Sequence, residues 1–79
     1  MRLKYIYQIG KHQVGIHDES VNELADSYGG KLTTDDVEYA ISQLRKFGEK
    51  YWAIIDEFAL LLHFMTKENS DAIIIEKNN

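Results

Sequence analysis

The sequence has 79 residues with no cysteine and no proline, 44% hydrophobic and 28% charged residues, and a formal net charge of −4. A chain of this length supports one small core, so residues 1–79 are expected to form a single domain. The absence of cysteine excludes disulfide bonds and cysteine-based zinc sites, which leaves packing, alone or extended by self-association, to stabilise the fold.

Acidic residues are concentrated in the middle of the chain. Residues 18–38 contain seven acids against Lys31 alone, a balance of −6, whereas residues 1–17 carry three bases and no acid. A surface with this charge opposes binding to phosphate backbones. Direct binding to nucleic acid is therefore not expected of this segment.

No targeting or membrane segment is predicted. Lys4 and Lys11 interrupt the region where a signal peptide needs a continuous apolar core. The longest apolar stretch is itself interrupted by Asp56 and Glu57. We therefore expect a cytoplasmic protein with no membrane partner.

The N-terminus has the pattern of a β-hairpin. Residues 3–9 alternate apolar and polar side chains, which is the periodicity of a strand. Glycine and lysine at residues 10–11 suit a two-residue turn. That turn places Tyr7 opposite Val14, and the apolar side chains of both strands then share one face.

Two helices are expected after the hairpin. A capping box that begins at Ser20 predicts a helix of about ten residues, which ends before Gly29 and Gly30. Thr33, with acids in the following turn, predicts the start of the second helix. Its apolar stripe extends to Phe47, with a glycine cap beyond it.

Residues 51–65 carry more apolar side chains than one helical face requires. Their spacing predicts a helix over about residues 50–66, although a pair of strands is the alternative for this stretch. In the helix, Ala53, Leu60 and Phe64 form a second apolar face. Either the C-terminal segment covers that face, or a partner does, including a second copy of the chain in a homodimer.

A β-branched run over residues 71–76 predicts a final strand, and residues 77–79 are expected to fray. Placed beside the hairpin, this strand completes a three-stranded antiparallel or mixed sheet with the helices on one side. The expected fold class is α+β, with an N-terminal β-hairpin, three helices and a C-terminal strand.

No group of residues supports catalysis, a cofactor or a metal ion. The segment from His17 to Ser20 holds the residue types of a catalytic triad, but consecutive residues rarely converge on one point. The paired acids Asp35-Asp36 and Asp56-Glu57 point about 100° apart on a helix. We therefore expect a protein that is not an enzyme and binds neither cofactor nor metal.

One segment resembles a known family. Residues 23–48 are similar to the helix–turn–helix of winged-helix DNA-binding proteins in their packing positions, which are Leu24, Ala25, Gly29, Val37, Ile41, Leu44 and Gly48. The resemblance implies a DNA-binding transcription regulator. It departs from the family at Asp35 and Asp36, because the start of the recognition helix usually presents polar or basic side chains.

The composition favours a different function. A compact, acidic, cysteine-free chain without a catalytic site is similar in type to phage-type small inhibitors, such as anti-CRISPR and DNA-mimic proteins. We therefore expect a small regulatory or inhibitory protein that acts by binding another protein, such as a nucleic-acid-binding protein. The winged-helix regulator is the alternative.

Two surfaces are candidates for binding the partner. On the second helix, Tyr39 points away from the apolar stripe and lies among acids, so it combines a large ring with a charged surround. On the third helix, the second apolar face offers a further contact. The candidate site residues are Asp35, Asp36, Glu38, Tyr39, Leu60 and Phe64.

Overall fold

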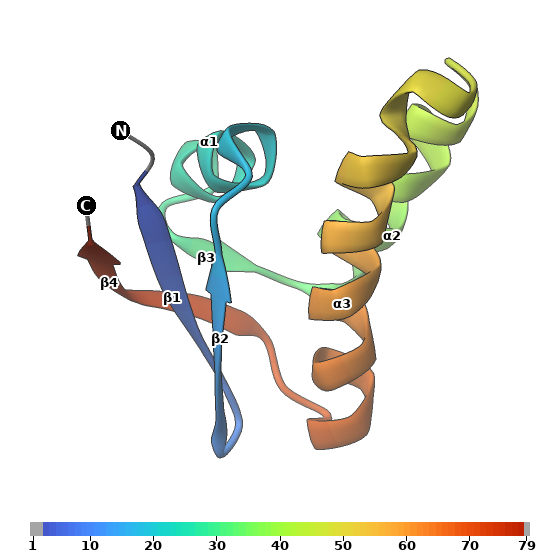
Figure 1. The fold of residues 1–79 in the computed structure, drawn as a ribbon. Coiled ribbons are helices and arrows are strands. Elements are labelled where there is room, and N and C mark those ends of the chain that lie inside the picture. Colours follow the sequence, from blue (N-terminus) through green and yellow to red (C-terminus); the bar gives the residue numbers. More distant parts are fainter. Residues whose placement is uncertain (1–2, 79) are drawn as a thin grey trace.

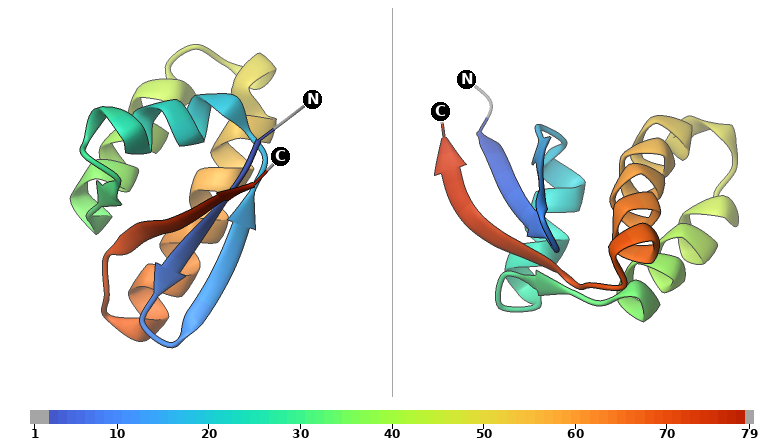
Figure 2. Two further views of the ribbon diagram at one scale, coloured as in Figure 1. Left: turned by 90° about the vertical axis from the view of Figure 1, so that its left-hand side faces the viewer. Right: turned by 90° about the horizontal axis from the view of Figure 1, so that it is seen from below.

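The computed structural model describes residues 3–78 and has the predicted α+β fold, with one antiparallel sheet and the helices on one side of it (Figures 1 and 2). The elements in chain order are β1 (Lys4–Ile9), β2 (His12–Ile16), α1 (Glu19–Ser27), β3 (Lys31–Leu32), α2 (Thr34–Arg45), a 3-10 turn (Glu49–Tyr51), α3 (Trp52–Glu68) and β4 (Ala72–Asn78).

The sheet has the strand order β2-β1-β4-β3. The hairpin register is the predicted one, since Tyr7 pairs with Val14 in β1 and β2. The C-terminal strand β4 lies beside β1, as expected, and pairs with it antiparallel. The fourth strand, β3, was not predicted, because a two-residue strand has no periodicity and exists only through its pairing with β4.

The core occupies one face of the sheet. Tyr7, Ile9 and Ile16 are fully buried beneath the helices. On the opposite face, Ile73 and Ile75 of β4 are about half exposed. Helix α3 packs on β1 and β2, and α2 packs on α3, so that α3 lies between the hairpin and α2 when the molecule is viewed from below (Figure 2, right).

The helix boundaries follow their capping residues, with one correction. Asp18, rather than Ser20, caps α1, because its Oδ1 accepts hydrogen bonds from the backbone N–H groups of Ser20 and Val21 at 2.9 and 3.1 Å. The cap of α2 is the predicted one. The Thr33 side chain accepts from the Asp36 N–H, and the Asp36 carboxylate accepts in return from the Thr33 N–H.

Two predictions about the ends of elements were wrong. Phe47 is 63% exposed and is not part of the core, because α2 ends at Arg45 and its apolar stripe ends with it. The expected fraying of residues 77–79 is contradicted at Lys77 and Asn78, which belong to β4. Asn79 lies outside the described residues.

Residues 52–68 form one helix, α3, and not a strand pair. The residues of its second apolar face differ in exposure. Phe64 is half-buried beside the His12 ring of β2, with ring centroids 5.1 Å apart, whereas Leu60 is 42% exposed and Ala53 is exposed. The C-terminal segment does not cover this face, because β4 is placed in the sheet beyond β1.

The hairpin turn packs closely on the end of α3. Gly10 has a φ of 58°, which favours glycine, and a Cβ at this position would lie 2.7 Å from Oε1 of Glu68. His12 Nε2 is buried 3.1 Å from Oε2 of Glu68, without the alignment of a hydrogen bond. The glycine in the turn is therefore required by packing as well as by backbone conformation.

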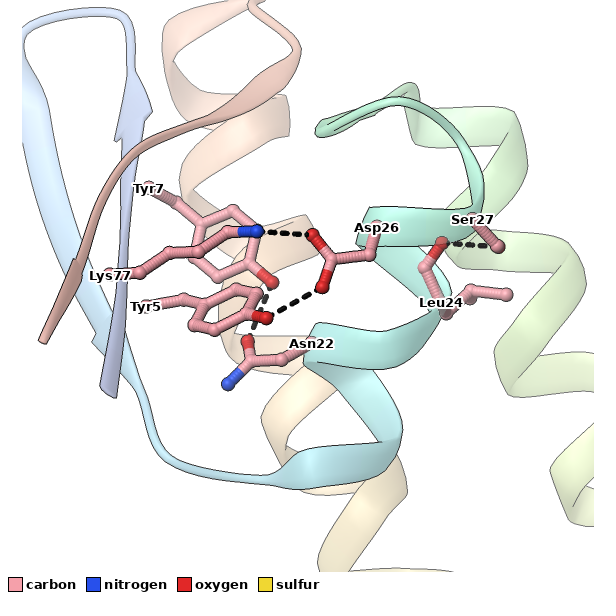
Figure 3. A network of polar contacts seen from close by, with 7 residues as sticks. All are labelled: Tyr5, Tyr7, Asn22, Leu24, Asp26, Ser27 and Lys77. Carbon is pink, nitrogen blue, oxygen red and sulfur yellow. Dashed lines mark hydrogen bonds and ion pairs between the residues drawn. The ribbon is translucent and has the colours of Figure 1, made fainter. Parts of the chain in front are cut away.

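A network of polar side chains links α1 to the sheet through hydrogen bonds (Figure 3). The buried Tyr7 hydroxyl donates to Oδ1 of Asn22 at 2.7 Å, and Nδ2 of Asn22 donates to the Ile16 carbonyl at 3.0 Å. Nearer the surface, the Tyr5 hydroxyl and Lys77 Nζ both donate to the Asp26 carboxylate, at 2.6 and 2.9 Å.

This network shifts the pKa of its members. The hydrogen bond from Tyr5, followed by that from Lys77, lowers the pKa of Asp26 below its ordinary value of 3.8. The same bonds to Asp26 raise the pKa of Tyr5 and of Lys77. Burial is the main cause of the raised pKa of Tyr7.

Removal of the Tyr7 hydroxyl tests the buried bond. Tyr7→Phe leaves Oδ1 of Asn22 buried without a donor, so we expect a loss of about 1–3 kcal/mol in the free energy of unfolding. Tyr28→Phe is the matched control, because Tyr28 is 47% exposed, and it should change stability by less than about 0.5 kcal/mol. Equal stability of both variants in urea unfolding would contradict this role for Asn22.

Asp26 makes stability depend on pH in a defined direction. Its lowered pKa means that its contribution is fully present above about pH 4 and is lost as the pH falls through the folded-state pKa. The raised pKa values of Tyr5 and Lys77 place the corresponding alkaline loss above about pH 10.

The test is the melting temperature of the wild type and of Asp26→Asn as a function of pH. We expect a constant difference between them from about pH 5 to about pH 9, and a shrinking difference below about pH 4. A difference that stays constant down to pH values of about 2 would show that Asp26 is not linked to folding in this way.

Candidate partner-binding groove

A groove of about 330 Å³ lies between α1 and α2 and is hereafter called the α1–α2 groove. Three groups of residues line it: Ser20, Leu24 and Tyr28 from α1 and its cap, Asp36, Tyr39, Ala40, Gln43 and Leu44 from α2, and Tyr51, Ile54 and Phe58 as the floor. Most of these side chains are apolar or aromatic, which is typical of a surface that binds a ligand or a partner.

The groove exists because α1 and α2 are held by different parts of the molecule. Asn22 and Asp26 bind α1 to the sheet, whereas α2 packs on α3. A helix–turn–helix would pack α1 directly on α2 across a short turn. Here the connecting segment instead contains β3, which pairs with β4, so the resemblance in packing positions does not extend to the arrangement of the two helices.

Tyrosine side chains stand at the rim of the groove. Tyr39 is 64% exposed, as its predicted position opposite the apolar stripe requires, and Tyr28 is 47% exposed on the facing wall. Tyrosine provides a large contact area with a polar tip and few rotatable bonds, which suits an interface anchor. The groove therefore combines two exposed aromatic rings with a partly buried apolar floor.

The acidic segment forms one part of the groove and supplies Ser20, Leu24, Tyr28 and Asp36 to its lining. Residues 18–38, which carry the balance of −6, form α1, β3 and the first turn of α2. Asp36 lines the groove directly, and Asp35 is exposed beside it. Asp36 is also committed to the cap of α2 through the Thr33 N–H at 2.9 Å, so Asp35 is the acid that remains available to a partner.

The structure does not bring the other predicted site residues into this groove. Glu38 lies on the opposite flank of α2, in a larger cavity of about 840 Å³ between α2 and α3. Leu60 and Phe64 belong to α3 outside the groove, and Phe64 is partly covered by His12. Of the six predicted residues, Asp36 and Tyr39 are therefore the two that line one concave surface.

Sequence reasoning missed the contributions of Tyr28 and Tyr51. Both tyrosines stand at helical spacing from apolar residues, and that spacing carries no sign that the apolar stripe borders a groove rather than a neighbouring helix. Within residues 3–78, no three histidine or acidic side chains gather as potential metal ligands. In the same part of the chain, no helix is long and apolar enough to cross a bilayer.

Substitutions at Tyr39, Asp35 and Asp36 should separate binding from folding. Tyr39→Ala affects an exposed side chain, so it should change the free energy of unfolding by less than about 0.5 kcal/mol. Asp35→Lys replaces an acid in the first turn of α2 by a base, so it should cost about 0.3–1 kcal/mol through the helix dipole. Asp36→Lys removes half of the capping box, so it should cost about 0.5–2 kcal/mol. Chemical denaturation of the three variants checks this order, and a destabilised Tyr39→Ala would contradict the exposed position of the ring.

Comparisons with known proteins assign neither a family nor a function to the chain. The sequence matches no family model, and neither a curated protein nor a solved structure shows significant similarity to it. The shape, charge and exposed aromatic side chains of the α1–α2 groove are therefore the basis on which a function is argued.

Proposed function

We propose that the protein is a non-enzymatic regulator or inhibitor that acts by binding another protein in the α1–α2 groove. The observation that carries this proposal is the pairing of exposed Tyr28 and Tyr39 with a partly buried apolar floor, next to the acids Asp35 and Asp36. Binding energy at interfaces is concentrated in such aromatic anchors, surrounded by polar rims.

The negative charge beside the α1–α2 groove indicates what kind of partner to expect. An acidic rim favours a partner with a basic surface, and it accelerates encounter through long-range attraction. Surfaces that bind nucleic acids are basic, so a nucleic-acid-binding protein fits this requirement. The mechanism would be occlusion of that surface, in the manner of phage-type inhibitors such as anti-CRISPR or DNA-mimic proteins, and a cysteine-free chain is compatible with action in the cytoplasm.

Affinity capture with matched variants tests this proposal. The immobilised wild type, Tyr39→Ala and Ser42→Ala are each exposed to the same extract, with and without nuclease treatment. Ser42 is exposed on the opposite flank of α2, so it serves as the control. We expect a protein that is retained by the wild type and by Ser42→Ala, and whose affinity for Tyr39→Ala is at least about fivefold lower.

The outcomes distinguish binding in the groove from binding elsewhere on the surface and from DNA binding. Equal capture by Tyr39→Ala and the wild type would exclude the groove as the binding site. Capture that disappears on nuclease treatment would instead support the winged-helix alternative, as would a salt-dependent shift of random duplex DNA by the purified protein. A slower association of Asp35→Lys with the captured protein would support attraction to a basic partner.

A further inference from the structure

One face of α3 is exposed along its whole length and is hereafter called the α3 face. It consists of Trp52, Asp56, Ala59, Leu60, His63 and Lys67, all of which are exposed. On a helix with 3.6 residues per turn, these positions lie within an arc of about 100°. Trp52 is 59% and Leu60 is 42% exposed, so residues 3–78 leave two large apolar side chains on this face partly exposed.

The polar side chains of the α3 face are distributed unevenly along the helix, with the acid and the nitrogen-bearing groups at different ends. Asp56 lies in the N-terminal half, whereas His63 and Lys67 lie in the C-terminal half. Two such faces packed in parallel would place like groups together. Packed antiparallel, they place unlike groups together, which is the condition for a self-complementary two-fold interface.

We propose that the α3 face binds a second copy of the chain in an antiparallel, two-fold arrangement, with the axis between Ala59 and Leu60. Asp56 and His63 are equally far from that point along the helix, so each Asp56 faces His63 of the second copy. An imidazole N–H can donate to the carboxylate whether or not the ring is charged.

The same axis pairs the remaining residues of the face. Trp52 and Lys67 are also equally far from the central point, so the ammonium group of one copy approaches the indole ring of the other, which is a favourable cation–π combination. At the axis, Leu60 meets Ala59 and Leu60 of the second copy. The small side chain of Ala59 lets the two helices approach closely there.

The size of the contact predicts a reversible dimer. One helix from each copy buries less than the roughly 1,600 Å² of a standard interface, so the dimer should dissociate on dilution. This inference does not rest on the proposed function, because the α1–α2 groove and the α3 face share no residue. A negative result for the groove therefore leaves the dimer proposal unaffected, and the reverse also holds.

Sedimentation of the full chain over a range from about 5 µM to about 1 mM tests the inference, since weak dimers dissociate in this range. We expect a concentration-dependent dimer in the wild type and a monomer in Leu60→Glu. Ile75→Glu is the matched control, because Ile75 is 49% exposed on the other face of the sheet, and it should still dimerise. Emission from Trp52, the single tryptophan, should shift with dimer formation in the control but not in Leu60→Glu.

A charge exchange tests the orientation of the two copies. His63→Glu places like charges opposite Asp56 twice in each dimer, so it should weaken association at least about tenfold. Asp56→Lys combined with His63→Glu recreates an opposite-charge pair and should restore association to within about threefold of the wild type. Equal weakening of the single and double variants would overturn the antiparallel arrangement.

An introduced thiol gives a readout that does not depend on a disruptive substitution. The sequence has no cysteine, so Ala59→Cys provides a single thiol at the proposed axis, and Ser27→Cys provides one on α1 as a control. Ala59→Cys should form a disulfide-linked dimer under mild oxidation much faster than Ser27→Cys. Equal rates, a monomeric wild type at the highest concentration, or a Leu60→Glu variant that remains dimeric would each overturn the proposal, and circular dichroism confirms that every variant is folded.

Discussion

The hydrogen bond from the Tyr7 hydroxyl to Asn22 joins α1 to the sheet within a largely apolar core. Asn22 also donates to the Ile16 carbonyl, so α1 is held in one orientation over β1 and β2. A buried polar pair of this kind is costly to break, because either partner left alone loses its hydration without compensation. The position of α1, and with it one wall of the α1–α2 groove, depends on this pair.

The α1–α2 groove exists because α1 and α2 pack on different parts of the molecule. The sheet holds α1, while α2 packs on α3. A small domain gains stability when it closes such gaps, so an apolar groove left open beneath two exposed tyrosines is the feature on which the proposed partner binding rests. Of the acids in residues 18–38, Asp36 lines the groove, whereas Asp26 bonds to the sheet and Glu38 lies on the opposite flank of α2.

The features predicted from the sequence are those set by neighbouring residues. The hairpin register depends on a turn and on alternation, the cap of α2 depends on Thr33 and Asp36, and the exposure of Tyr39 depends on helical phase. The features that were missed depend on distant segments. Lys77 is ordered by Asp26, 51 residues away, β3 exists only beside β4, and the groove requires three helices whose separation no local pattern encodes.

The sharpest test of the groove as a binding surface is nuclear magnetic resonance of the isotopically labelled protein, titrated with the protein that it captures. If the partner binds in the α1–α2 groove, the largest chemical-shift changes will fall on Leu24, Tyr39 and Leu44, with smaller changes elsewhere. Changes confined to the outer sheet face at Ile73 and Ile75, with the groove residues unaffected, would contradict binding in the groove.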